Sequence, residues 1–425
     1  MRPIYTAMLW LLAAMLPGFL HAQVQQLTPA EIPSEYGISP GKLANLDSWL
    51  QSWVQAKKVP NAVTFVARRG KILHYKAYGW QNIQQGTELK RDDIFRIASQ
   101  TKAITTVAIL MLHEEGKLFF DDPISKYMPF FANPQVLVRY DTTTGAIETR
   151  PASREITIRD LLTHTSGIPY GHPLENLEPY KVPYLNSLEP DRLSSVVPKI
   201  AARPLLHDPG TAFTYGMNTD VLGYLVELIS GESLDTFFRE RIFLPIGMKD
   251  THFYLPVEKA PRLVELYAKP HPDSQLVVSP EFSNRYFPLQ GARTYFSGGA
   301  GLVSTIEDYA KFCQFLLNRG EFNGKRLLGA KSVDLMFRDQ IGNGITMPGT
   351  TDMFSFGLGI FSGHSDYGGL AGPGAAWWGG AYGSEYTIDP KENLIMIVYT
   401  NLMPFPERAE FLRKFRTLVY QSLTN

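Results

Sequence analysis

Cysteine is almost absent from this chain of 425 residues, which contains a single one, Cys313. One thiol cannot form an internal disulfide, so the fold depends on its core and not on cross-links. Cys313 lies in the apolar run 309–317, which is typical of a helix. This setting favours a small core residue over a thiol nucleophile.

Net charge is missing as well, because 41 Lys and Arg residues balance 41 Asp and Glu residues. The chain has no charge block, low-complexity tract or internal repeat. A neutral chain lacks the basic surface typical of nucleic-acid-binding proteins. Histidine spacings typical of metal sites, such as H-E-x-x-H, are also absent. We therefore expect a small-molecule partner, no nucleic acid, no metal and no other cofactor.

Long apolar runs are confined to the first residues of the chain. Arg2 is followed by the almost entirely apolar stretch 7–20, and His21-Ala22 then precedes the polar Gln23. This order is typical of a signal peptide, and we predict cleavage after Ala22 and a periplasmic or secreted protein. No later run is long enough to cross a membrane, so we expect no stable membrane insertion.

The remaining sequence predicts strands near both ends of the chain and helices between them. Two β-rich runs surround Arg69-Gly70, which predicts a hairpin, and the run 394–399 is apolar on both faces, which predicts a central strand. Further expected elements are a surface hairpin at 136–150, a helix at 303–317, a strand at 354–361 and a helix at 407–423.

We therefore predict an α/β (α+β) fold with one antiparallel sheet that is built from both chain ends and flanked by helices. The predicted boundaries are a signal peptide at 1–22, an α/β domain at 37–125 and 286–425, and an inserted, mostly helical domain at 126–285. An active site would then lie between the two domains.

The segment Ser99-Gln100-Thr101-Lys102 is the strongest indication of chemistry. It opens the apolar stretch 103–112, which contains no Gly or Pro and predicts a buried helix. Residues three apart share one helix face, and a helix N-terminus favours developing negative charge. A partly desolvated lysine can lose its proton near neutral pH and then accept the serine proton. Ser99 is therefore a candidate nucleophile that Lys102 activates without a histidine.

Spacing alone does not establish this role, because Ser39 and Lys42 form a second S-x-x-K. Pro40 and Gly41 lie inside that one, so we expect no continuous helical face there. Ser39 is also the centre of a G-x-S-x-G match, but no strand precedes it, as a nucleophile elbow requires. We interpret Ser39 as a turn or helix-cap residue.

Several short segments follow one another along the chain in the order 95–102, 157–167, 209–215, 299–302 and 378–380. Together they resemble the serine β-lactamase and penicillin-binding-protein superfamily. Within its class C-like branch they are most similar to the family VIII carboxylesterases. The resemblance extends from Gly37 to the C-terminus, and it implies the β-lactamase/transpeptidase-like fold.

The resemblance also implies roles for individual residues. Tyr215 would be a phenolate-like general base that Lys102 holds, and the segment Trp378-Gly379-Gly380 would line the cleft beside Ser99. The backbone N–H groups of Ser99 and Ala381 would form the oxyanion hole. Without side chains, Gly379 and Gly380 would let a substrate approach the strand closely.

Two departures from the superfamily pattern bear on the substrate. Trp378 replaces a lysine that attracts the carboxylate of a β-lactam, and Met217 replaces an asparagine that binds an amide. Asn218, one residue later, would substitute for it in part only if the loop differs, and its spacing argues against this role. What remains is an aromatic mouth, for which we predict the residues Tyr170, Trp377, Trp378 and Tyr382.

We therefore expect a serine hydrolase that forms an acyl-enzyme, most simply a carboxylesterase acting on a small ester or amide. One alternative is a β-lactamase, D-alanyl carboxypeptidase or D-aminopeptidase with the same residues. Others are an acyltransferase and a non-catalytic binding protein on the same scaffold. We expect His164 to be a structural residue near a helix end and not a base.

Overall fold

The computed structural model describes residues 26–178, 180–183, 189–342, 344–365 and 367–424. The predicted signal peptide lies outside these ranges. A nine-stranded sheet has the order β1-β3-β2-β17-β16-β15-β14-β13, with β4 paired to β3. Its strands are β1 (Thr28–Pro29), β2 (Asn61–Arg68), β3 (Lys71–Asn82), β4 (Thr87–Glu88), β13 (Met353–Phe354), β14 (Gly359–Ile360), β15 (Ala376–Gly380), β16 (Ser384–Asp389) and β17 (Leu394–Tyr399).

This sheet is built from both ends of the chain, as predicted, because β17 pairs with β2. All its pairs are antiparallel except β1 with β3, which are parallel. β17 lies between β2 and β16, so both of its faces are buried, as expected for a central strand.

Helices cover the sheet on both faces, in three layers. Leu394, Met396 and Val398 belong to the apolar core shared with α1 and α11, whereas Ile395 and Ile397 belong to the core shared with α2 and α9. This alternation follows the two-residue period of a strand. The four helices are α1 (Pro40–Gln55), α2 (Thr101–Glu114), α9 (Ile306–Leu317) and α11 (Arg408–Tyr420).

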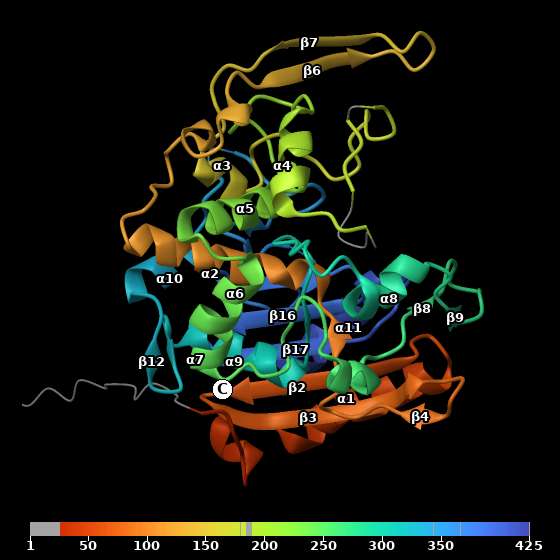
Figure 1. The fold of residues 1–425 in the computed structure, drawn as a ribbon. Coiled ribbons are helices and arrows are strands. Elements are labelled where there is room, and N and C mark those ends of the chain that lie inside the picture. Colours follow the sequence, from red (N-terminus) through yellow and green to blue (C-terminus); the bar gives the residue numbers. More distant parts are fainter. Residues whose placement is uncertain (1–25, 179, 184–188, 343, 366, 425) are drawn as a thin grey trace, which may run out of the picture.

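A mostly helical region stands above the sheet, and the hairpin β6–β7 projects from its far end (Figure 1). This region contains β6 (Gln135–Tyr140), β7 (Ile147–Pro151), α3 (Ile158–Leu162), α4 (Leu193–Ala201), α5 (Asn218–Ser230) and α6 (Leu234–Phe238). It fits the predicted helical insertion, and the exact boundaries of the two domains stay a prediction.

The other short elements connect these parts. They are β5 (Phe95–Arg96), β8 (Tyr267–Ala268), β9 (Val277–Val278), β10 (Val303–Ser304), β11 (Glu321–Phe322), β12 (Lys325–Arg326), α7 (Leu244–Ile246), α8 (Phe282–Gln290) and α10 (Ala330–Met336), with single turns η1 (Pro33–Tyr36), η2 (Ala98–Gln100), η3 (Ile124–Lys126), η4 (Pro129–Phe131), η5 (Arg239–Phe243) and η6 (Val257–Arg262). No helix in the described ranges is long and apolar enough to span a membrane.

Two local predictions differ from the structure. The helix expected at 303–317 begins only at Ile306, because β10 pairs with β5 and the Thr305 side chain caps the helix. The strand expected at 354–361 is two short antiparallel strands, β13 and β14. Gly357 lies between them with φ of +73°, a left-handed conformation that turns the chain back on itself.

Candidate active site

Ser99 lies in the turn η2, immediately before α2, and is partly exposed between the buried Ala98 and Gln100. Ala98 has φ of +43°, which is uncommon for a residue with a Cβ atom and indicates local strain. The turn is anchored on both sides of Ser99. The Ile97 N–H donates to Leu302 O at 3.1 Å, and the Tyr309 hydroxyl donates to Gln100 O at 2.9 Å.

The side chain of Lys102 is completely buried and points back toward Ser99. Its Nζ donates to Gly299 O at 2.7 Å, to Tyr170 Oη at 3.1 Å and to Ser99 Oγ at 3.3 Å. A lysine ammonium has three donors and no acceptor, so each of its N–H groups has one oxygen partner here. The geometry fits the charged form of Lys102.

The electrostatic surroundings of Lys102 lead to the same conclusion. Burial lowers the pKa of Lys102, but the phenols of Tyr170 and Tyr215 and the Asp220 carboxyl raise it, and the net pKa lies above the ordinary value. The structure therefore favours an ammonium group at neutral pH, in place of the neutral amine expected from the sequence.

Tyr215 lies just before α5, with its ring 4.7 Å from Lys102 Nζ. The indole N–H of Trp378 donates to the Tyr215 hydroxyl oxygen at 3.2 Å. On the other side, the His164 ring lies 4.7 Å from the Tyr215 ring, and its Nδ1 accepts the Gly216 N–H. Burial, with a contribution from Lys102, holds the pKa of His164 well below its ordinary value, so this histidine is neutral. His164 thus supports the segment that carries Tyr215.

Tyr170 is the second tyrosine beside Lys102, and its backbone is hydrogen-bonded to that of Tyr215. The Tyr170 N–H donates to Tyr215 O at 3.2 Å. This close packing of the two segments requires a glycine at position 216, because a Cβ atom there would lie 2.0 Å from Ile168 O. Burial raises the pKa of Tyr170 although Lys102 opposes the shift. Tyr170 therefore stays protonated and contacts Lys102 as a neutral phenol.

The glycines of β15 have protein neighbours where a substrate was expected. A Cβ atom on Gly380 would lie 2.3 Å from Ile97 O, and one on Gly379 would lie 2.8 Å from Ser384 O and 2.9 Å from Arg408 Nη2. Gly380 thus lets the end of β15 pack against the segment that precedes Ser99. Packing within the protein is thus a further reason for the two glycines, while Gly379 also lines the pocket beside Ser99 and close approach of a substrate there stays a prediction.

A pocket of about 530 Å³ opens beside Ser99. It is lined by Ser99, Tyr215, Tyr367, Trp377, Trp378, Gly379, Ala381, Pro406, Arg408, Ala409 and Leu412. The nucleophile candidate, the tyrosine base candidate and the two expected oxyanion donors therefore share one cavity. Trp377 and Trp378 form aromatic walls, as the sequence suggested. Tyr170 and Gly380, which we also expected at the substrate, are not among the residues that line this pocket, and Tyr170 contacts Lys102 behind Ser99.

Two expected substrate contacts lie elsewhere. Tyr382 is 3% exposed and packs with Ala98 and Leu266 in a separate apolar cluster. Asn218 is 0% exposed, and its amide is bonded to His164, Ser166 and the Ile168 carbonyl. Neither side chain reaches the pocket, which corrects both expectations. The position of Tyr382 depends on the strand register of the sheet, and that of Asn218 depends on where α5 begins. The local sequence pattern predicts neither.

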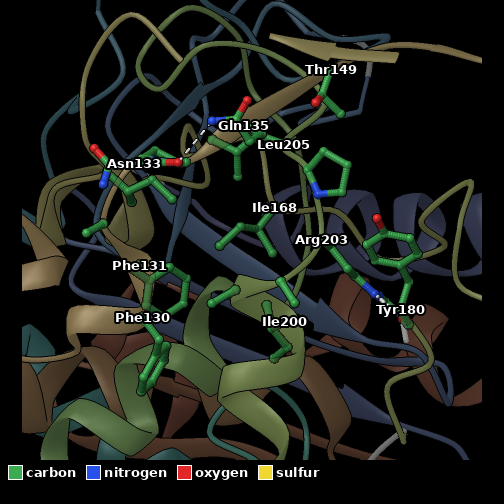
Figure 2. A pocket seen from close by; sticks show the side chains of 16 residues that line it. Phe130, Phe131, Asn133, Gln135, Thr149, Ile168, Tyr180, Ile200, Arg203 and Leu205 are labelled. Carbon is green, nitrogen blue, oxygen red and sulfur yellow. Dashed lines mark hydrogen bonds between the residues drawn. The ribbon is translucent and has the colours of Figure 1, made fainter. Parts of the chain in front are cut away.

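A second cavity, of about 160 Å³, lies in the helical region near β6 and α4 (Figure 2). Phe131, Ile168, Ile200 and Leu205 form much of its wall, and the site residues above take no part in it. Among the residues that the structure describes, no three His, Cys, Asp or Glu side chains are grouped as metal ligands would be.

The sheet from both chain ends, the helical region above it and the serine–lysine pair at the start of α2 define a serine hydrolase with the β-lactamase/transpeptidase-like fold. A family model described as Beta-lactamase matches residues 46–421. The chain belongs to the β-lactamase family.

Related proteins are similar over most of the chain. A Mycobacterium tuberculosis protein, Rv1367c, is 34% identical over 79% of this chain and 84% of its own. A lovastatin esterase of Penicillium rubens is 30% identical over 82% of this chain and 90% of its own. The solved structure of EstCE1, described as a hydrolase with promiscuous acyltransferase activity, has a TM-score of 0.75 and 25% identity over 89% of this chain and 99% of its own.

Proposed function

We propose that this protein is a carboxylesterase that forms an acyl-enzyme on Ser99. The observation that carries the proposal is the contact of Lys102 Nζ with Ser99 Oγ at 3.3 Å, on the wall of a pocket that also contains Tyr215. The similarity to a lovastatin esterase and to EstCE1, which is described as a hydrolase, supports ester hydrolysis.

In the proposed reaction, Ser99 Oγ attacks the ester carbonyl carbon while its proton passes to the phenolate oxygen of Tyr215. The N–H groups of Ser99 and Ala381 stabilise the negative oxygen of the tetrahedral intermediate. The bond to the alcohol then breaks, and Tyr215 returns the proton to the leaving alkoxide. The positive charge of Lys102 and the indole N–H of Trp378 lie where they can stabilise negative charge on the Tyr215 oxygen during these steps.

Water completes the cycle by the same route. Tyr215 takes a proton from the attacking water, and the hydroxide adds to the acyl carbon. The ester bond to Ser99 then breaks, the carboxylic acid is released, and the proton held by Tyr215 returns to Ser99 Oγ.

Replacement of Ser99 tests the proposal, and Ser39 offers a matched control within the other S-x-x-K. Ser99→Ala should lower p-nitrophenyl butyrate turnover by at least about a thousandfold. Ser39 caps α1, with its Oγ accepting the Lys42 N–H at 3.4 Å. Ser39→Ala should cost about 1 kcal/mol of stability and leave turnover intact. A Ser99→Ala enzyme with a tenth or more of the normal rate would overturn the assignment.

Transfer of the acyl group to an alcohol is a second candidate, which the description of EstCE1 favours. A pocket of about 530 Å³ has room for an acceptor beside a short acyl chain. Added short alcohols should then divert product from free acid to a new ester while p-nitrophenol release stays constant. Free acid as the sole product would exclude this second reaction.

The β-lactamase and peptidase alternatives have less support. Trp378 supplies no cation at its position, and Met217 is 2% exposed and cannot bind a substrate amide. We expect nitrocefin and D-amino acid amides to react far more slowly than short esters. Comparable rates would favour these alternatives.

Export to the periplasm or medium also stays a proposal. N-terminal sequencing of the mature protein, which we expect to begin at Gln23, would test it.

A further inference from the structure

Asp220 is a buried carboxyl group that takes no part in the proposed reaction. It lies in the first turn of α5 and is 2% exposed, and no described residue forms a direct ion pair with it. Lys102 is 0% exposed and also has no direct ion-pair partner within the described residues. A buried charge is costly unless an opposite charge or hydrogen bonds compensate it. These two opposite charges therefore need compensation from within the protein.

A chain of three hydrogen bonds connects the two groups. Lys102 Nζ donates to Gly299 O at 2.7 Å, on one side of a peptide bond. The N–H on the other side of that peptide bond belongs to Ala300 and donates to Ser297 Oγ at 3.1 Å. The Ser297 hydroxyl donates in turn to Asp220 Oδ1 at 2.5 Å. Every donor points from the ammonium toward the carboxylate, so each bond polarises the next in the same direction.

Two glycines bring this backbone against the carboxylate. The Gly299 N–H also donates to Asp220 Oδ1 at 3.4 Å, and a Cβ atom on Gly299 would lie 2.5 Å from Asp220 Oδ2. A Cβ atom on Gly298 would lie 2.6 Å from Thr219 O. On the opposite side, the Thr105 hydroxyl donates to Gly298 O at 2.7 Å. The absence of two side chains thus lets the bridging peptide fit between α2 and α5.

No other group around the pair supplies a negative charge. The titratable side chains that face it are phenols and one imidazole, namely Tyr170, Tyr215, Tyr295 and His164. Burial raises the pKa of Tyr170 and of Tyr295 and lowers that of His164. Burial also raises the pKa of Asp220, but its hydrogen-bond donors and Lys102 oppose this shift. Asp220 is therefore the group that balances the lysine charge.

We propose that Ser297 and Asp220 are positioning residues that keep Lys102 charged and fixed through this chain of hydrogen bonds. The inference rests on the proposed esterase function and adds two residues that touch no substrate, because neither lines the Ser99 pocket. The chain holds the ammonium where it donates to Ser99 Oγ. In this place its charge can stabilise negative oxygen during the reaction, which a neutral amine does far less well.

The pH dependence of turnover tests the proposal, because a merely structural role would lower the rate equally at every pH. Asp220→Asn removes the opposite charge, so Lys102 should lose its proton at a lower pH than in the wild type. Relative to the wild type, its kcat/KM for p-nitrophenyl butyrate should fall by about a further tenfold between pH 7 and pH 9.5. Ser297→Ala breaks the chain and keeps the carboxylate, and its relative kcat/KM should fall by about threefold over the same range.

Two matched variants remove similar buried groups elsewhere. Asp308 is 3% exposed and pairs with Lys311 at 3.0 Å, and Ser422 is 0% exposed and donates to Val419 O at 2.6 Å. Asp308→Asn and Ser422→Ala should lower stability and leave the pH dependence of kcat/KM as in the wild type. A pH-dependent loss of equal size in these controls would overturn the positioning role.

Denaturant unfolding separates this inference from the proposed function, because it requires no turnover. In the Asp220→Asn protein, the pKa of Lys102 should lie below that of the unfolded chain, which is about 10.4. The unfolded chain then binds the extra proton, so raising the pH stabilises this variant relative to the wild type. The gap between the two denaturation midpoints at pH 9.5 should be less than about half of the gap at pH 7.

The two measurements have distinct outcomes. A gap that narrows in this way, without ester turnover in the wild type, would overturn the esterase and keep the buried pair. Ester turnover with parallel pH profiles and a constant gap would overturn the roles of Ser297 and Asp220 alone.

Discussion

Replacing Trp378 by phenylalanine tests the hydrogen bond that supports the proposed base. The indole N–H donates to Tyr215 Oη at 3.2 Å, and the Trp378 ring packs 5.4 Å from the Tyr215 ring. Trp378→Phe removes the donor and keeps an aromatic ring in the same place. Its effect on catalysis therefore reports mainly on the lost hydrogen bond.

The expected magnitude follows from the charge on the acceptor. A hydrogen bond to a charged group contributes about 1.5–3 kcal/mol, and each 1.4 kcal/mol is about tenfold in rate. If Tyr215 reacts as a phenolate, kcat/KM for p-nitrophenyl butyrate should fall by about 10- to 100-fold.

Trp377 provides the matched comparison, because its indole nitrogen is buried without a partner. Trp377→Phe trims the same atoms from the same pocket wall and breaks no hydrogen bond, so we expect a loss below about threefold. Steady-state kinetics with p-nitrophenyl butyrate would measure both variants. Equal losses in the two variants would refute the reasoning.

Three further predictions concern charge, packing and pH. Asp220 accepts the Ser297 hydroxyl at 2.5 Å and raises the pKa of Lys102, so Asp220→Asn should lower kcat/KM about tenfold in the same assay, and a normal rate would show that this buried charge is dispensable. Gly380→Ala would place a Cβ atom 2.3 Å from a backbone carbonyl oxygen, and thermal unfolding should show a loss of about 1–3 kcal/mol, whereas an unchanged Tm would contradict the packing argument. Burial, with the nearby Lys259, lowers the pKa of His252 to about 4. Below about pH 6.5 the unfolded chain therefore binds a proton at this histidine that the folded protein does not bind. The free energy of unfolding consequently falls as the pH drops from about 6.5 to about 4. Denaturant unfolding at pH 7 and pH 4.5 should therefore show a smaller loss for His252→Gln than for the wild type, by up to roughly 3 kcal/mol, and equal losses would argue against the buried histidine.

Much of the fold could be predicted because the relevant patterns are local. The run 394–399 is apolar on both faces, and this pattern correctly predicted that β17 lies at the centre of the sheet. The same reasoning failed at 303–317 and 354–361, where a pairing with β5 and a glycine turn interrupt an apolar run. The spacing of apolar residues within one segment does not predict pairing with a strand that is far away in the sequence.

In the candidate active site, too, the local features were predictable from the sequence and the contacts between distant residues were not. The three-residue spacing of Ser99 and Lys102 at the start of a helix brought their side chains together, as predicted. The partners that keep Lys102 charged could not be predicted in this way, since Gly299 lies 197 residues along the chain and Tyr170 lies 68. The sequence suggested a free amine because it shows the burial of a lysine but not the oxygens around it.

The sequence by itself determined where the candidate nucleophile Ser99 and its lysine lie, which run of residues forms the central strand, and which residues of the superfamily pattern are replaced. These features depend on spacings of a few residues, which helix and strand geometry convert directly into neighbours. The tertiary structure decided which oxygens hold Lys102, why Gly379 and Gly380 are glycines, and that Arg408 shares the pocket with Ser99. Such contacts depend on the packing of α11 against the sheet and on strand register, and both arise from long-range burial that no local segment encodes.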